Sequence, residues 1–208
     1  MREALAAWQR ALTRAVSEAM EGDVPRLVFG DGNPDSPLLM LVGEAPGEQE
    51  AREGKPFVGK AGKNLNAFLA TVGIARDALY VSNVVKFRPS RVSKAGRTVN
   101  RPPTSAEISL FVPWLHREVA LIRPRAIVTL GNVALNAFIP GGAVIGELHG
   151  QWQSVPIYHE AQSTLVLPLF ALYHPAAVIY NRALGEVYQA DLEQLTKTLA
   201  LSSKLSDN

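Results

Sequence analysis

Short apolar runs alternate along this sequence with segments of helical spacing, and this alternation constrains the fold more than any other feature. Each run is continuously apolar, as expected for a strand that is buried on both faces of a parallel sheet. The runs cover residues 38–42, 79–85 and 126–130 and part of 165–172. Helical patterns lie at about 62–73, 104–122, 131–138 and 184–200. The alternation predicts an α/β fold whose four strands are mainly parallel.

Two further patterns set the limits of helices. Apolar residues recur at helical spacing from Leu5 to Met20, which predicts an N-terminal helix over about residues 3–21. Thr104 followed by Glu107 is a capping-box pattern just before an apolar segment, so we expect a helix to begin there. The chain has 208 residues, of which 47% are hydrophobic, and this predicts a single domain, residues 1–208, around one substantial core.

The composition excludes several kinds of chemistry. The sequence has no cysteine, which excludes disulfides, thiolate metal sites, cysteine nucleophiles and cysteine-ligated iron-sulfur clusters. No apolar stretch reaches the roughly 18 residues that a membrane helix needs, and the N-terminus lacks the apolar centre of a signal peptide. We therefore expect a cytoplasmic monomer with no membrane partner. A formal net charge of +2 permits a nucleic-acid partner without indicating one.

Polar residues follow the predicted strands at their carboxyl ends, where open α/β sheets bind ligands. After the first strand, a segment rich in glycine and proline runs from Gly43 to Gly62 and carries Glu44, Glu50 and Phe57. Small residues let the backbone approach a flat ligand closely, and Phe57 offers an aromatic face. The segment suits a planar base. A surface loop with solvated carboxylates and a core phenylalanine would show the same pattern.

Asn83 and His174 are single polar residues beside apolar runs. Asparagine is depleted in strands, and the donor and acceptor of the Asn83 side chain match the imide edge of a base such as uracil. His174 precedes Pro175, which favours an extended backbone and holds the imidazole at the edge of the sheet. A neutral imidazole there can donate to a developing oxyanion. Each residue has a structural alternative, with partners in a neighbouring loop.

A basic segment follows the second strand. Residues 86–101 carry six basic side chains and no acidic one. Such a composition suits contacts with DNA phosphates, which supply affinity without reading sequence, although a solvated loop is the alternative. The predicted DNA-binding residues are Lys86, Arg88, Arg91, Lys94, Arg97 and Arg101.

Five motifs in this order resemble the uracil-DNA glycosylase superfamily, and their spacing is similar to its family-four, iron-sulfur branch. They are Gly-Glu-Ala-Pro-Gly at 43–47, Pro-Phe-Val-Gly-Lys-Ala-Gly at 56–62, Asn83, Asn100-Arg101 with Pro-Pro-Thr after it, and Tyr-His-Pro-Ala at 173–176. The similarity begins near Phe29 and continues loosely into the last helix. It implies a three-layer α/β/α fold and a DNA N-glycosylase. Such an enzyme flips uracil out of DNA and hydrolyses its N-glycosidic bond, leaving an abasic site for base excision repair.

The resemblance also implies how the base is held. Phe57 stacks on the extruded uracil, Asn83 reads its imide edge, and His174 binds the oxygen on which negative charge collects. Cytosine presents an amino donor and an unprotonated ring nitrogen to the same asparagine. A fixed amide would therefore face mismatched groups, at a cost of roughly 1 to 3 kcal/mol for each unsatisfied polar group.

The resemblance leaves the water-activating residue open. Glu44 and Glu50 both match acidic positions of the family motif, and either can stabilise the sugar cation or orient the attacking water. Other branches carry an aspartate where this sequence has Ala45. Ala45 and Asn100 are assigned to substrate binding.

One departure from the family is large. Family-four enzymes carry four cysteines that bind an iron-sulfur cluster, and two of those positions match Phe87 and Phe111 in this sequence. We expect no cofactor and no metal, with packing of these two rings in place of the cluster. Each buried phenylalanine contributes roughly 1.5 to 3 kcal/mol.

Two other functions fit parts of the sequence. The first is a noncatalytic or trapping uracil-DNA-binding relative, although relatives that trap DNA use a histidine in the basic loop and residues 86–101 contain none. The second is a nucleotide- or phosphate-binding regulatory protein built on the glycine-rich turn. It is disfavoured because the sequence lacks a Walker lysine-serine pair and a dinucleotide fingerprint.

Overall fold

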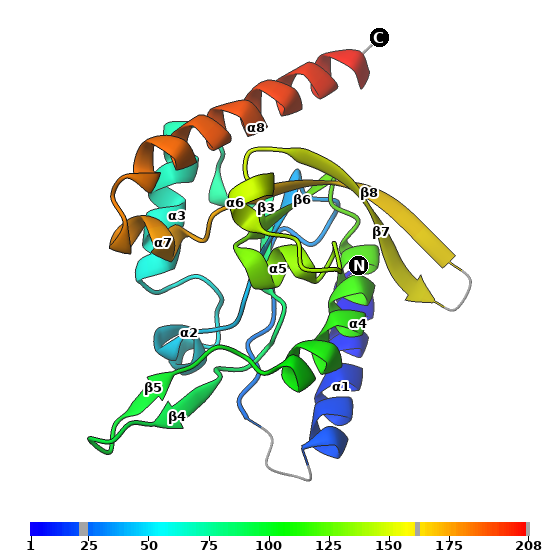
Figure 1. Ribbon diagram of the computed structural model, residues 1–208. Helices are drawn as coiled ribbons and strands as arrows, with labels where there is room; N and C mark the ends of the chain where they lie inside the picture. Colours follow the sequence, from blue (N-terminus) through cyan, green and yellow to red (C-terminus); the bar gives the residue numbers. More distant parts are fainter. Residues whose placement is uncertain (21–24, 161–162, 207–208) are drawn as a thin grey trace.

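A six-stranded sheet forms the centre of the protein, with strand order β1-β3-β2-β6-β8-β7 (Figure 1). The computed structural model describes residues 1–20, 25–160 and 163–206. The four inner strands are parallel to their inner neighbours: β3 (Leu79–Asn83), β2 (Leu39–Gly43), β6 (Ala126–Leu130) and β8 (Ser163–Leu172). These are the four predicted strands, so the α/β fold with a mainly parallel sheet is confirmed.

Two antiparallel edge strands were not predicted. β1 (Asp31–Gly32) pairs with β3, and β7 (Trp152–Glu160) pairs with β8. A two-residue strand is too short to show a pattern. β7 carries Pro156, which lacks the N–H of a ladder donor and is therefore tolerated on an edge strand. Edge strands also lack the continuous apolar run that identified the inner ones.

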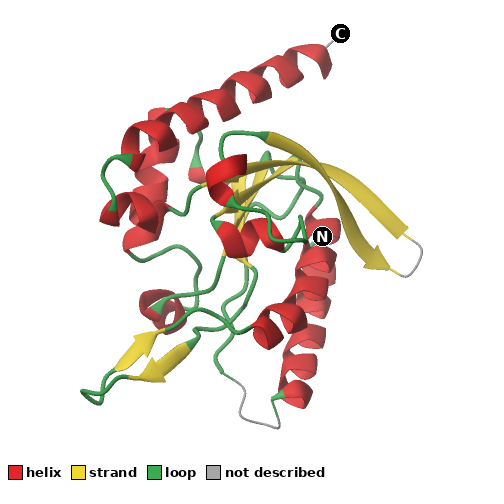
Figure 2. Cartoon of the chain, viewed as in Figure 1, coloured by secondary structure: helices red, strands yellow, loops and turns green. Residues whose placement is uncertain are grey.

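Helices cover both faces of the sheet, which gives the three layers (Figure 2). Residues of β2 alternate between two apolar clusters: Met40 and Val42 belong to one, and Leu39 and Leu41 to the other. The first cluster includes side chains of α1 (Arg2–Ala19), α4 (Ser105–Ile122), α5 (Asn132–Asn136) and α6 (Ile145–Leu148). The second includes side chains of α3 (Lys60–Thr71) and α8 (Leu184–Ser206).

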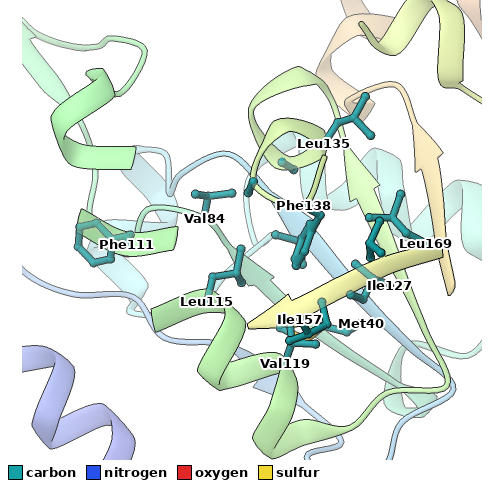
Figure 3. Close-up of a cluster of buried hydrophobic side chains, with 14 of the residues drawn as sticks. Met40, Val84, Phe111, Leu115, Val119, Ile127, Leu135, Phe138, Ile157 and Leu169 are labelled. Carbon is teal, nitrogen blue, oxygen red and sulfur yellow. The ribbon is translucent and has the colours of Figure 1, made fainter. Parts of the chain in front are cut away.

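Helix α4 supplies much of the first cluster. Figure 3 shows Leu115 and Val119 of α4 beside strand residues Met40 and Ile127. The helix begins with the predicted capping box: the Glu107 N–H donates to Thr104 Oγ1 (3.2 Å), and the Thr104 N–H donates to Glu107 Oε2 (2.6 Å). These bonds satisfy two N–H groups that a helix start leaves unpaired. Within the described ranges, no helix is long and apolar enough to cross a membrane.

Several element limits differ from those predicted. β3 ends at Asn83 rather than at residue 85, because residues 84–87 form a bend. Residue 21, the predicted end of the N-terminal helix, lies outside the described residues. Four short elements near the carboxyl edge of the sheet were missed: α2 (Glu48–Glu53), β4 (Ser90–Val92), β5 (Thr98–Asn100) and α7 (Pro175–Tyr180). A 3-10 turn, η1 (Arg76–Ala78), precedes β3.

Candidate active site

A cavity of about 660 Å³ lies at the carboxyl ends of the parallel strands. This is the edge at which open α/β sheets bind ligands. The loop after β2, the end of β3 and the start of α7 all contribute to its wall. Six predicted site residues line it: Ala45, Glu50, Phe57, Asn83, Asn100 and His174. The fold therefore brings together residues that lie up to 129 positions apart, from Ala45 to His174 (174 − 45 = 129).

Asn83 and Phe57 meet over a glycine. Gly43 pairs with Asn83 across the parallel strands β2 and β3. A Cβ atom at Gly43 would lie 2.6 Å from Asn83 Oδ1 and 2.7 Å from Phe57 Cζ, so only glycine leaves room for both side chains. Asn83 is 4% exposed, and its amide makes no hydrogen bond to the residues that the structure describes. The amide is thus held in the wall of the cavity with its donor and acceptor free for a ligand.

The backbone at Phe57 is strained. Its φ of 57° lies in the left-handed region, which costs a residue other than glycine on the order of 1 kcal/mol or more. Gly62 lies against it so closely that a Cβ there would overlap the Phe57 carbonyl oxygen. The glycine at 62 therefore allows the conformation that places the Phe57 ring beside Asn83. Strain of this kind is concentrated at binding sites.

Glu50 connects α2 to the start of α3. Its Oε1 accepts a hydrogen bond of 2.8 Å from the Gly59 N–H, and Gly59 is the residue that caps α3. Gly47 and Gly59 lie on either side of the carboxylate, where a Cβ atom would come within 2.8 and 2.9 Å of its oxygens. Glu50 is thereby held in one position in the wall of the cavity.

Glu44 has a different environment. It is half-buried, and burial raises the pKa of its carboxyl group. It is not among the residues that line the cavity, and in the described part of the chain its side chain has no hydrogen-bond partner. The two carboxylates that the sequence left as alternatives therefore occupy distinct places, and only Glu50 faces the cavity.

His174 is held in one orientation by the helix that it begins. The Ala176 N–H donates a 3.1 Å hydrogen bond to His174 Nδ1, and Pro175 occupies the first turn of α7. Burial lowers the pKa of His174, with the negative charge of Glu50 opposing that shift. A neutral ring whose Nδ1 accepts carries its proton on Nε2. His174 therefore offers a single N–H donor.

Sequence reasoning missed Asn64. Its Nδ2 donates a 3.0 Å hydrogen bond to the carbonyl oxygen of Pro175, and this bond links α3 to the backbone just after His174. An asparagine within an amphipathic helix has no pattern that distinguishes it from a solvated residue. Its role depends on a partner 111 positions away.

The structure contradicts the predicted DNA contact of Lys86. This side chain is 0% exposed and forms an ion pair with Glu118 of α4, with 2.6 Å between Nζ and Oε2. A lysine without solvent access cannot reach a phosphate. The sequence suggested otherwise because Lys86 opens a basic segment, and its partner lies 32 positions away.

The other basic residues fall into two groups. Arg88 donates to Asn100 Oδ1 (2.7 Å) and lies 3.2 Å from Glu48 Oε2. Arg101 forms two bonds with Glu107, and these bonds hold the pKa of that carboxyl group at about 2. The remaining three, Arg91, Lys94 and Arg97, are exposed on the β4–β5 hairpin. The hairpin projects from the edge of the protein beside α2 (Figure 1).

Phe87 and Phe111 occupy the positions that match cluster ligands in family four. They are 4% and 0% exposed, and their ring centroids lie 5.8 Å apart. Phenylalanine has no ligand atom, and the sequence contains no cysteine, so these positions do not fit an iron-sulfur cluster. In the described ranges, no group of three or more histidine, cysteine or acidic residues is placed to hold a metal ion.

The fold and the site together define an α/β protein with a base-sized cavity that presents an amide, an aromatic ring and a neutral imidazole at the carboxyl edge of its sheet. The chain belongs to the uracil DNA glycosylase superfamily, whose family model matches residues 29–199. The family predicted from the five motifs is therefore confirmed.

Similar proteins carry a more specific name. A type-4 uracil-DNA glycosylase of Saccharolobus solfataricus is 37% identical over 182 residues, which cover 85% of this chain and 77% of the relative. One of Archaeoglobus fulgidus is 36% identical over 172 residues, 81% of this chain and 79% of the relative. One of Thermotoga maritima is 36% identical over 179 residues, 86% of this chain and 84% of the relative.

Proposed function

We propose that this protein is a uracil-DNA glycosylase, which hydrolyses the N-glycosidic bond of uracil flipped out of DNA and leaves an abasic site for base excision repair. The observation that carries the proposal is the buried, unpaired amide of Asn83 beside the ring of Phe57 in the cavity. Membership of the superfamily and the similarity to type-4 enzymes support it. Flipping is required because the glycosidic bond is inaccessible within stacked DNA.

Recognition of uracil rests on Asn83 and Phe57. The amide oxygen of Asn83 accepts from the N3–H of uracil, and its nitrogen donates to O4. The ring of Phe57 stacks on the base. Cytosine reverses the pattern of donors and acceptors on this edge, so the same amide would face mismatched groups. The backbone strain at Phe57 and the close approach at Gly43 hold both side chains in place before the base arrives.

Cleavage rests on charge rather than on a strong nucleophile. Uracil departs as an anion, and the Nε2–H of His174 donates to the oxygen on which its charge develops. A neutral donor suffices, since the ring is already oriented by the Ala176 N–H. Glu50, the carboxylate that faces the cavity, stabilises the sugar cation or orients the attacking water. We assign this role to Glu50 in preference to Glu44.

The substrate pocket extends to a DNA-binding hairpin. Arg91, Lys94 and Arg97 are exposed, and Asn100 at the end of the same hairpin lines the cavity. Phosphate contacts from this hairpin supply affinity that offsets the cost of unstacking the base. The role of the basic segment is thus assigned to these three residues, without Lys86.

Replacement of Arg91, Lys94 and Arg97 by serine is expected to weaken DNA binding with little change in kcat at saturating DNA. Each lost phosphate contact lowers the slope of log K against log salt by about 0.9 on a duplex, so three lower it by about 2.7. Binding to a uracil-containing duplex, measured over a range of salt concentrations, gives this slope. Serine in place of the exposed Arg2, Arg10 and Lys197 removes the same charge elsewhere. An equal loss in this control would show an effect of net charge alone.

The experiment that tests the function is multiple-turnover release of uracil from single- and double-stranded oligonucleotides, followed by strand cleavage at the abasic site. Release of many uracils by each protein molecule is expected. Tight binding of uracil-containing DNA without release would instead identify a noncatalytic relative. A covalent complex would identify a trapping relative, which the absence of histidine from residues 86–101 disfavours.

We also propose that residues 1–208 form one domain. The two apolar clusters lie on opposite faces of the same sheet and share its strands, which supports a single folding unit. Packing of Phe87 against Phe111 supports an enzyme that works without the cluster of its relatives.

A further inference from the structure

A buried ion pair lies directly behind Asn83. Lys86 follows β3, Glu118 belongs to α4, and both side chains are 0% exposed, with 2.6 Å between Nζ and Oε2. Two hydroxyl groups of β3 complete the cluster. The Tyr80 hydroxyl donates to Glu118 Oε1 (3.0 Å), and the Ser82 hydroxyl donates to the same carboxylate (3.0 Å to Oε2). Nothing in the proposed chemistry uses these buried groups directly.

The ammonium group of Lys86 also binds the backbone of Asn83. Its Nζ donates to the carbonyl oxygen of Asn83 and to Ser82 Oγ, both at 2.6 Å. With Glu118, these atoms give three acceptors for the three N–H donors of the ammonium group. Asn83 is the last residue of β3, where the chain leaves the sheet and bends. The ion pair therefore anchors the peptide group from which the base-reading side chain projects.

Stability alone does not account for this arrangement. Two charges lose their hydration on burial, and an apolar pair of similar volume is often equally or more stabilising. A charged donor gives something that an apolar pair lacks, which is a directional bond to one chosen carbonyl. Strand alternation sends Ser82 towards α4 and Asn83 to the other face. The network can thus hold Asn83 without entering the cavity.

We propose that Lys86 and Glu118 are positioning residues for uracil recognition, fixing the Asn83 backbone so that its amide meets the imide edge of the base. This inference rests on the proposed glycosylase function. Neither residue touches DNA, and both act through Asn83.

The test compares Lys86→Met in the wild type and in Asn83→Ala, using single-turnover uracil release at saturating enzyme. In the wild-type background we expect a loss of roughly 10- to 100-fold, as for misplacement of a recognition group by a fraction of an ångström or more. DNA affinity and its salt dependence should stay unchanged. In the Asn83→Ala background Lys86→Met should cost nothing further, because its target is already absent. Equal losses in both backgrounds, or a lower salt slope, would overturn the proposal.

Two further variants separate positioning from folding. Lys197→Met removes an exposed lysine of α8 and should leave release unchanged. Lys86→Met combined with Glu118→Leu avoids an unpaired buried carboxylate and gives the same comparison if Lys86→Met alone does not fold. A folded double variant with wild-type release would refute positioning while leaving the glycosylase function intact. Absence of release from the wild type would refute the proposed function, and this inference with it.

Discussion

Replacement of Asn83 by alanine is expected to lower kcat/KM for uracil release roughly 100- to 1,000-fold. The amide supplies two hydrogen bonds to the imide edge, and the variant leaves those base atoms unpaired in a dry cavity. A cost of about 1.5 to 2 kcal/mol for each gives about 3 to 4 kcal/mol, and each 1.4 kcal/mol is a factor of ten. The measurement is release of uracil from a single-stranded oligonucleotide over a range of substrate concentrations.

The fold should tolerate this change. The Asn83 side chain has no hydrogen-bond partner among the described residues, so its removal leaves no protein group unpaired. The midpoint of thermal unfolding should therefore stay within a few degrees of that of the wild type. Asn66→Ala, which removes an exposed amide from α3, is the matched control. Release near the wild-type rate from a folded Asn83→Ala protein would remove Asn83 from base recognition.

Replacement of His174 by alanine is expected to lower kcat roughly 100- to 1,000-fold, as does the loss of one donor to a developing oxyanion in other enzymes. Alanine also removes the cap of α7, so His174→Asn is the matched variant. Asparagine is a good helix cap but is too short to replace the Nε2–H donor. Both variants should lose kcat alike, with only alanine lowering the stability of α7. Recovery of activity in His174→Asn would assign His174 a capping role alone.

The activity of the wild type should resist acid to below the ordinary pKa of histidine. Burial lowers the pKa of His174 from 6.5, so the ring stays neutral as the pH falls through 6.5 and takes up a proton only below that value. Protonation then places a hydrogen on Nδ1, opposite the Ala176 N–H, and the orienting bond is lost. Nitrogen NMR of the imidazole reports both the tautomer and the titration. A ring that titrates above 6.5 would contradict the proposed state.

Much of the sheet could be predicted because its inner strands are buried on both faces and so are continuously apolar. The same argument failed for β7, which lies at an edge and contains Pro156. The Asn83 and His174 positions followed from the order of polar residues along strand ends. The end of β3 at Asn83, two residues earlier than predicted, brings this side chain to the edge where the cavity lies.

Charge in the sequence was a poorer guide than hydrophobicity. Lys86 belongs to a segment of six basic residues, and that pattern predicts solvent and phosphate. A basic side chain can be buried when a distant carboxylate pays its desolvation, and Glu118 lies on a helix whose packing no local pattern reveals. The choice between Glu44 and Glu50 had the same obstacle, because both are acidic residues of one loop. Only the turn of α2 directs Glu50 to the cavity.

The sequence by itself determined the α/β class, the four parallel strands, the superfamily, and the absence of thiolate ligands. These properties depend on local periodicity, on motifs in order and on composition, all of which are present before the chain folds. Tertiary structure alone decided which carboxylate faces the cavity, that Lys86 is buried against Glu118, that Phe87 packs on Phe111, and that the Phe57 backbone is left-handed. The physical reason is that burial, desolvation and strain depend on contacts between residues far apart in sequence, and such contacts exist only in the folded chain.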